Sequence, residues 1–383
     1  SERSRGLGDV YKRQEKNLEV ITYTADLGQG DISDDLEEKA KNLGATKVIV
    51  EDLTEEFISD YVFPMFRCNT IFEGEYLLGT AIARPLIAKK LVEIGKREGT
   101  NIICHGATGK GNDQIRFEIG AHALNPSIEV IAPWRDWDMV SRTDLMNYCK
   151  NHQIPMPASK AEEPPFSMDE NLLHISYEGG VLEDLNNAPP EDMWLNTKSL
   201  ENASEKSEEI TIEFSKGDPV ALNGKTLSSA QLFRELNLLG GKHGIGRIDI
   251  VESRVTGMKS RGCYETPGGT ILLKTRRAME SLCLTGEEIK NKDKLIPDYA
   301  ALIYEGLWWS NKRVNLQSEI DSVSNKVNGK VSVKLYKGNI ISISKESSNS
   351  LYNENKVSFE EEGGFSNEDM KSHIKKNILD YDN

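Results

Sequence analysis

The sequence lacks a long apolar run, paired cysteines and an apolar leader. No stretch of about 18 apolar residues occurs, which excludes a membrane-spanning helix. The opening SERSRGLGDVYKRQ has no apolar centre, so it is not a secretory signal. The five cysteines are scattered and none forms a C-x-x-C pair. This argues against a zinc knuckle or a disulfide framework and favours a reducing cytoplasm.

The sequence also lacks basic excess and two common enzyme motifs. Lys plus Arg number 47 and Asp plus Glu 61, giving a net charge of −14. This charge argues against nucleic acid and anionic membranes as partners, but allows an anionic small substrate held by a few local cations. The histidines form neither H-x-x-x-H nor H-E-x-x-H, so we expect no metal held by the protein. No G-x-S-x-G occurs, so a hydrolase elbow is not supported.

What is present is typical of a globular protein. The chain has 383 residues, of which 38% are apolar and 28% charged. These proportions exclude a collagen, a coiled coil and a disordered chain. The length predicts two domains, or three.

The first half alternates short apolar strands with helices. This order predicts βαβ units and a parallel sheet, with ligands beyond the carboxyl ends of the strands. The expected strands are 19–24, 47–50, 101–104 and 129–132, and the expected helices are 34–42, 72–96 and 113–124.

The second half has a different pattern. A proline-rich stretch, Pro155–Pro165, reads as a linker. After it we expect an α+β arrangement without regular alternation. The expected strands are 210–214, 247–252, 330–335 and 339–344, and the expected helices are 268–282, 299–325 and 369–379.

Two loops follow expected strands and are candidate ligand sites. The segment 105–113 reads HGATGKGND, and its glycines, Lys110 and the following helix start suit an anion. It matches neither the Walker nor the dinucleotide glycine pattern, and a glycine-rich turn capped by Asn112 or Asp113 is equally consistent. The segment 25–30, ADLGQG, is either a plain turn or a place where Gln29 and the backbone approach a nucleoside.

Other polar residues remain open from pattern alone. Arg84 and Arg116 lie on helical segments near these loops. Each either binds a carboxylate or phosphate through two hydrogen bonds of its guanidinium group or is a solvated surface side chain. The segment 258–266, MKSRGCYET, together with Glu252, is either a pocket wall or a basic hairpin loop. The serines of 166–178 do not stand out by themselves.

Several ordered motifs resemble the argininosuccinate synthase family and extend from about residue 16 to about residue 350. They are YTADLGQG (23–30), DYVFP (60–64), EGEYLLGTAIARPLIAKKLVEI (73–94), HGATGKGNDQIRFE (105–118), APWRDWDM (132–139), FSMDENLLHISYEGGVLED (166–184), GIGRIDIVESRVTGMKSRGCYETPGGTIL (244–272) and VKLYKGN (333–339). Two of these motifs, HGATGKGND (105–113) and GMKSRG-x-YETP, are highly specific for the family when they occur together.

The resemblance implies a fold and a reaction. It implies an α/β nucleotide-binding domain of the PP-loop ATP pyrophosphatase type, then an α+β synthetase and multimerisation domain, in a cytoplasmic homotetramer whose C-terminal helix reaches neighbours. It implies ligation of L-citrulline and L-aspartate with ATP and its Mg²⁺, through a citrullyl-adenylate, giving argininosuccinate, AMP and pyrophosphate. No general base is evident, so catalysis would rest on positioning and charge stabilisation.

The resemblance also implies residue roles. Carried over by motif, the ATP contacts are Ala25 and Gly106; the aspartate contacts are Thr108, Asn112 and Asp113; and the citrulline contacts are Tyr76, Thr80, Asn112, Arg116, Ser167, Ser176, Glu252 and Tyr264. Ala81 stands where some relatives have a serine near citrulline, so we expect one hydrogen bond to be replaced.

The N-terminal segment departs from the family. The family's phosphate loop reads S-G-G-L-D-T-S, whereas Ser4–Val10 reads SRGLGDV and lacks the Gly-Gly and Thr-Ser pairs. We therefore expect residues 1–15 to be a non-native leader, residues 16–160 a truncated nucleotide-binding domain, 161–365 the synthetase domain and 366–383 a helical tail. We expect weak binding of ATP phosphates and reduced stability as a result.

Two other hypotheses follow from the same residues. A paralogue without the phosphate loop would bind citrulline or aspartate without ATP turnover. A tRNA-thiolating enzyme of the same fold would need catalytic cysteines and a basic face, which the scattered cysteines and the charge of −14 disfavour.

Overall fold

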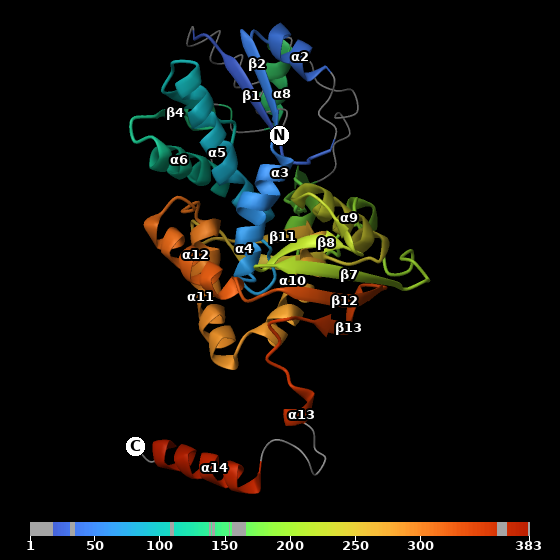
Figure 1. The fold of residues 1–383 in the computed structure, drawn as a ribbon. Helices are drawn as coiled ribbons and strands as arrows, with labels where there is room; N and C mark the ends of the chain where they lie inside the picture. The colour runs from blue at the N-terminus through green and yellow to red at the C-terminus, as the bar shows by residue number, and fades with distance from the viewer. Residues whose placement is uncertain are drawn as a thin grey trace.

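A computed structural model describes residues 18–30, 35–107, 111–137, 139, 142–152, 154, 166–357 and 366–381. The expected leader, the expected linker and Thr108 lie outside the described residues. Figure 1 shows the N-terminal part above two antiparallel sheets, with the C-terminal helix α14 standing clear of the rest.

The N-terminal part is the expected α/β arrangement with parallel strands. Strand β1 pairs with β2, and β3 with β4, both in parallel. Within the described residues the parallel strands form two pairs, and no described strand joins one pair to the other. The elements are β1 (Ile21–Asp26), α2 (Leu36–Asn42), β2 (Lys47–Asp52), α3 (Thr54–Phe57), a π-turn (Ile58–Val62), α4 (Phe63–Arg67), α5 (Gly79–Arg97), β3 (Ile102–Cys104), α6 (Asn112–Leu124), β4 (Glu129–Ile131), α7 (Pro133–Asp136) and α8 (Arg142–Asn151).

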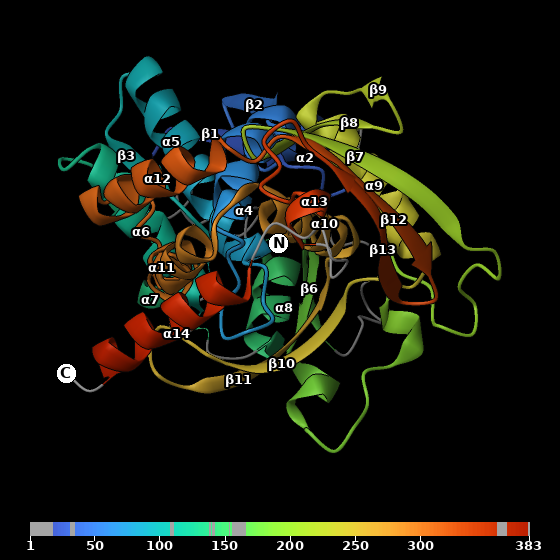
Figure 2. The same ribbon diagram turned by 60° about the horizontal axis from the view of Figure 1, so that its bottom comes forward.

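The C-terminal part contains two antiparallel sheets with strand orders β10-β11-β6-β5 and β13-β12-β7-β8-β9. Figure 2 shows the larger sheet on one side of the molecule and helices α11 and α12 on the other. The elements are β5 (Ser167–Glu170), β6 (Ile175–Glu178), 3₁₀ turns (Gly180–Glu183 and Glu191–Met193), β7 (Glu208–Ser215), β8 (Asp218–Leu222), β9 (Lys225–Thr226), α9 (Ser229–Lys242), β10 (Arg247–Ser253), β11 (Lys259–Glu265), α10 (Pro267–Cys283), α11 (Gly286–Tyr304), α12 (Asn311–Ser324), β12 (Gly329–Tyr336), β13 (Asn339–Glu346), α13 (Glu354–Val357) and α14 (Asn367–Tyr381).

The helix expected over 72–96 begins only at Gly79. The preceding residues form a turn in which Glu73, Gly74 and Leu78 all have positive φ. Such angles are incompatible with a right-handed helix. The turn brings Tyr76 into a buried position, where only 2% of the residue is exposed.

The helix expected over 299–325 is two helices, α11 and α12. The break contains Gly306, whose φ is +83°, and a Cβ at this position would lie 2.8 Å from the Cα of Arg116. Only glycine tolerates both the angle and the approach. The chain therefore turns where it packs against the N-terminal part.

One continuous apolar core joins the two parts. It runs from Ala25 and Phe57 through Leu86 to Leu236 and Val331. The 25–30 loop is part of this junction, because Leu27 accepts a 2.7 Å hydrogen bond from Leu172 of the second part. The first-half loops are therefore held against the antiparallel domain.

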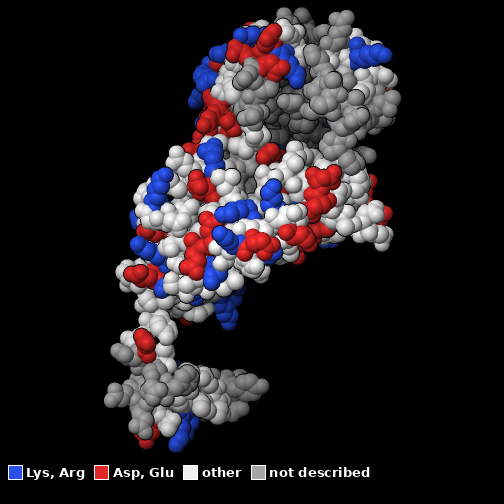
Figure 3. All heavy atoms as spheres, turned by 90° about the vertical axis from the view of Figure 1, so that its right-hand side faces the viewer, with Lys and Arg blue, Asp and Glu red and all other residues white. Residues whose placement is uncertain are grey.

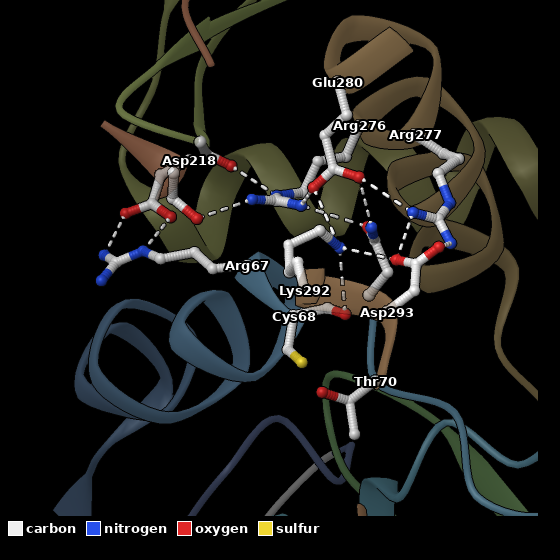
Figure 4. Close-up of polar contacts among 12 residues, drawn as sticks. Arg67, Cys68, Thr70, Asp218, Arg276, Arg277, Glu280, Lys292 and Asp293 are labelled. Carbon is white, nitrogen blue, oxygen red and sulfur yellow. Dashed lines mark hydrogen bonds and ion pairs between the residues drawn. The ribbon is translucent and has the colours of Figure 1, made fainter. Parts of the chain in front are cut away.

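A buried ionic network fixes the segment that precedes the Tyr76 turn (Figure 4). Glu280 of α10 is fully buried and pairs with Arg276 and, at 3.3 Å, with Lys292 of α11. It also accepts a 2.6 Å hydrogen bond from Asn69. The Lys292 ammonium donates to the carbonyl of Cys68 at 3.4 Å. Charges so buried persist only when they are paired, so the network holds residues 68–69 firmly on α10 and α11.

Candidate active site

Two stacked aromatic pairs form the buried wall of the candidate site. Tyr76 stacks on Tyr264 of β11 with ring centroids 4.3 Å apart. Phe72 stacks on Tyr304, the last residue of α11, at 3.9 Å. Tyr76 and Tyr304 meet edge to face at 6.4 Å, which joins the pairs. The Tyr264 ring lies over Gly262, where a Cβ would come within 2.4 Å of the hydroxyl.

A charge cluster lies at the start of α6. The Asp113 carboxylate accepts hydrogen bonds from Arg84 at 2.5 Å and from Arg116 at 3.0 Å. Burial alone would raise its pKa, but the two guanidinium groups hold the pKa of Asp113 at about 2. Arg84 also reaches Asp169 of β5 at 3.2 Å, so it bridges the two parts of the molecule.

An amide, a phenol and a carboxylate form a chain beside this cluster. Asn112 donates from Nδ2 to the Tyr304 hydroxyl at 3.0 Å, and that hydroxyl donates to Glu252 Oε1 at 3.1 Å. Burial raises the pKa of Glu252, while the Tyr264 and Tyr304 hydroxyls oppose this rise. Within the described residues, Glu252 Oε2 has no hydrogen-bond partner, which leaves a buried acceptor for a ligand.

A buried histidine holds the start of α5. His174 Nε2 lies 3.0 Å from Thr80 Oγ1, and its ring packs on Gly79, where a Cβ would be 2.3 Å away. Burial, aided by the Arg84 charge, lowers the pKa of His174 to about 3. The imidazole is therefore neutral at physiological pH and serves as a polar support for Thr80. The Thr80 amide itself donates to the Tyr76 hydroxyl at 3.2 Å.

The remaining residues of the prediction lie on β5, β6 and α5. Ser176 pairs in register with Tyr264 on one side and Asp169 on the other, and its hydroxyl donates to the Asp169 carbonyl at 3.4 Å. Ser167 is exposed on β5, opposite Glu178. Ala81 is fully buried in the core, among apolar side chains.

The two positions expected to contact ATP, Ala25 and Gly106, lie at or just beyond the carboxyl ends of parallel strands. Ala25 is next to last in β1, and Gly106 follows β3 after one residue. The Gln29 side chain folds back, donating to the Ala25 carbonyl at 2.8 Å and accepting from Leu27 N at 2.6 Å. The Asp26 carboxylate also accepts from Gly28 N, so the segment has the turn geometry that the pattern allowed.

Sequence reasoning missed three residues of this site, His174, Asp169 and Tyr304. His174 and Asp169 lie within the family motif at 166–184, so the motif marks the segment that holds them but not the two residues individually. Tyr304 lies inside an expected helix and gives no signal by pattern.

The described residues also bear on metal sites and on membrane-spanning helices. No group of three or more metal-ligating side chains occurs in the described part of the chain. Among the same residues, no helix is both long and apolar enough to cross a bilayer.

Comparison with known proteins identifies the family of this fold. Residues 10–155 match the family model for the arginosuccinate synthase N-terminal HUP domain, and residues 166–382 match the one for the C-terminal domain. The fold thus belongs to the class of HUP-domain synthetases. Argininosuccinate synthase of Helicobacter hepaticus is 57% identical over 375 residues, covering 97% of this chain and 91% of the relative. That of Stutzerimonas stutzeri is 56% identical over 364 residues, covering 95% and 90%. The chain belongs to the argininosuccinate synthase family.

Proposed function

We propose that the chain joins L-citrulline and L-aspartate at the expense of ATP, giving argininosuccinate, AMP and pyrophosphate. Family membership supports the reaction. The observation that carries the site assignment is the network of contacts that joins Tyr76, Asn112, Asp113, Glu252 and Tyr264 between the two parts of the molecule.

The first step activates citrulline. Its ureido oxygen attacks the α-phosphorus of ATP, a new O–P bond forms, and the bond to pyrophosphate breaks. A neutral ureido group needs both donors and acceptors, and Thr80, Arg116 and Tyr264 offer donors while Glu252 offers an acceptor. The serines Ser167 and Ser176 would complete this pocket from the β5–β6 edge.

The second step uses aspartate. Its α-amine attacks the activated ureido carbon, a C–N bond forms, AMP leaves with the former ureido oxygen, and the amine loses a proton. Asp113 suits the incoming ammonium because its carboxylate is ionised, and the start of α6 suits a carboxylate. Thr108 and Asn112 would complete this subsite.

ATP would lie along the carboxyl ends of the parallel strands. Ala25 and Gly106 would contact its adenosine, since both follow or end such strands. Mg²⁺ would arrive with the ATP as substrate complex and neutralise the pyrophosphate leaving group. We propose a cytoplasmic location, in keeping with scattered cysteines that form no C-x-x-C pair in the sequence.

We also propose a homotetramer. Helix α14 carries Met370, Ile374 and Ile378 at four-residue spacing, and about half of each side chain is exposed. A helical stripe of this kind needs a partner surface.

The distribution of surface charge does not favour nucleic acid as a partner. Lys, Arg, Asp and Glu are intermixed on the face drawn in Figure 3, so that face offers no basic patch.

The test is pyrophosphate release from ATP, with citrulline and aspartate each omitted in turn. It is run on this chain and on a version carrying a family-type first strand and phosphate loop. Full turnover only with both amino acids supports the proposal, and turnover confined to the second version supports the expected leader. Citrulline binding without release from either version would favour the non-enzymatic paralogue.

A further inference from the structure

The Tyr304 hydroxyl occupies the junction of the two amino-acid subsites. Tyr304 comes from the synthetase part, and its residue is only 2% exposed. Its hydroxyl contacts Asn112 on one side and Glu252 on the other. Its backbone carbonyl accepts from Arg116 Nε at 2.8 Å, and the Arg116 guanidinium lies 4.8 Å from the ring centroid.

The hydrogen-bond directions around this hydroxyl are fixed. The backbone N–H of Val255 can only donate, and it reaches Asn112 Oδ1 at 3.2 Å. The Asn112 amide therefore turns its nitrogen towards Tyr304. That nitrogen carries two hydrogens, of which Tyr304 accepts one, so the other can be donated to a substrate. The single hydroxyl hydrogen of Tyr304 is then committed to Glu252 Oε1.

We propose that the Tyr304 hydroxyl is a positioning group that presents Asn112 as a hydrogen-bond donor and fixes the Glu252 carboxylate, so that one side chain organises both the citrulline and the aspartate subsites. This inference rests on the proposed function and adds a residue to its site. Tyr304 acts through Asn112 and Glu252, and need not touch either substrate.

The hydroxyl also bears on the ionisation of Glu252. The groups that face this carboxylate are Tyr304 from α11, Tyr264 from β11, Arg116 from α6 and Glu178 from β6, with Tyr76 nearby. Burial and Glu178 raise the pKa of Glu252, whereas the two hydroxyls and Arg116 lower it. Loss of the Tyr304 hydroxyl therefore raises this pKa. The acid limb of kcat/KM for citrulline then moves to higher pH.

The variant Tyr304→Phe isolates the hydroxyl because it keeps the ring, its stack on Phe72 and its backbone carbonyl. We expect the KM values for citrulline and for aspartate each to rise by roughly tenfold, the effect of losing one hydrogen bond to a charged or polar partner. The KM for ATP should stay within about twofold, since the hydroxyl faces the amino-acid subsites.

The matched control is Tyr299→Phe, which removes another buried hydroxyl from the same helix. The Tyr299 hydroxyl binds Gln317 of α12, away from the pocket. Both variants should lower the melting temperature by similar amounts, but only Tyr304→Phe should shift the KM values and the acid limb.

Both variants are assayed in the version of the chain that releases pyrophosphate. Unchanged KM values and an unchanged acid limb in Tyr304→Phe, with turnover intact in the unaltered protein, overturn this inference alone. Equal kinetic losses in both variants also overturn it, because they indicate a general structural effect. No turnover by the unaltered protein in either version overturns the proposed function, and this inference with it.

Discussion

Charge pairing decides the chemistry at the scale of single residues. Asp113 lies between two arginines, and its side chain is about a quarter exposed, at 23%. Because its pKa is held at about 2, it stays ionised throughout the working pH range. It is therefore a fixed counter-charge and not a proton carrier.

The variant Asp113→Asn should lower kcat/KM for aspartate by roughly a hundredfold, equivalent to about 3 kcal/mol. It removes the carboxylate that pairs with Arg116 and that we propose receives the aspartate ammonium, while Arg84 keeps Asp169. The control is Asp169→Asn, at the more exposed end of the same arginine, where we expect a change of no more than roughly threefold. Equal effects of the two variants in initial-rate measurements would refute the assignment of Asp113.

His174 gives stability a pH dependence. Its pKa is about 3 in the folded chain, whereas the pKa of a histidine in the unfolded chain is about 6.5. The unfolded state thus binds the proton first, so stability is complete above about pH 6.5 and falls by ~1.4 kcal/mol per pH unit below it, towards pH 3. Urea unfolding at a series of pH values should show a shallower decline for His174→Gln than for the unaltered protein. Parallel curves would contradict a buried neutral imidazole.

The motif residues of the site could be predicted, whereas their supports could not. Tyr76, Asn112 and Asp113 stand in specific motifs, and the structure brings them together. His174 lies in an apolar stretch, and only its packing on Gly79 separates a site histidine from a core one. Tyr304 depends on the end of α11, and Gly306 marks that end in the sequence but not the contacts that Tyr304 makes. Residues that act through tertiary contacts leave little trace in the sequence.

At the scale of elements, the site depends on the segment that carries the Tyr76 turn. That segment is attached to α10 and α11 through the buried network around Glu280. The elements themselves were predicted where the pattern is strong, as for β1, α6 and α10. The sequence pattern does not mark strand β5, SMDE, because most of it is exposed and polar. It leaves β11 open as a possible loop because the first half of that strand, KSRG, is charged.

The variant Glu280→Gln should lower the free energy of unfolding by about 3–5 kcal/mol, since it removes the buried carboxylate that pairs with Arg276 and leaves Lys292 with Asp293. Glu319→Gln, an exposed glutamate on α12, should change it by no more than about 0.5 kcal/mol. Chemical denaturation checks both. A small loss for Glu280→Gln would mean that the network does not fix the Tyr76 segment.

At the scale of the whole molecule, we propose that the exposed apolar stripe of α14 takes part in assembly. Ile374→Asp places a charge in the middle of the apolar stripe and should convert the proposed tetramer into smaller species. Ser372→Asp adds the same charge to the exposed helix outside the stripe and should leave assembly unchanged. Analytical ultracentrifugation distinguishes these outcomes. A tetramer that survives Ile374→Asp would remove α14 from the interface.

The central claim is the proposal that citrulline is activated before aspartate attacks, at the residues gathered between the two parts of the molecule. The most direct measurement uses citrulline labelled with ¹⁸O in its ureido group, together with ATP and aspartate. Because the ureido oxygen bonds to the α-phosphorus and leaves with it, the label should appear in AMP. AMP formed without the label, with the oxygen retained elsewhere, would contradict the citrullyl-adenylate.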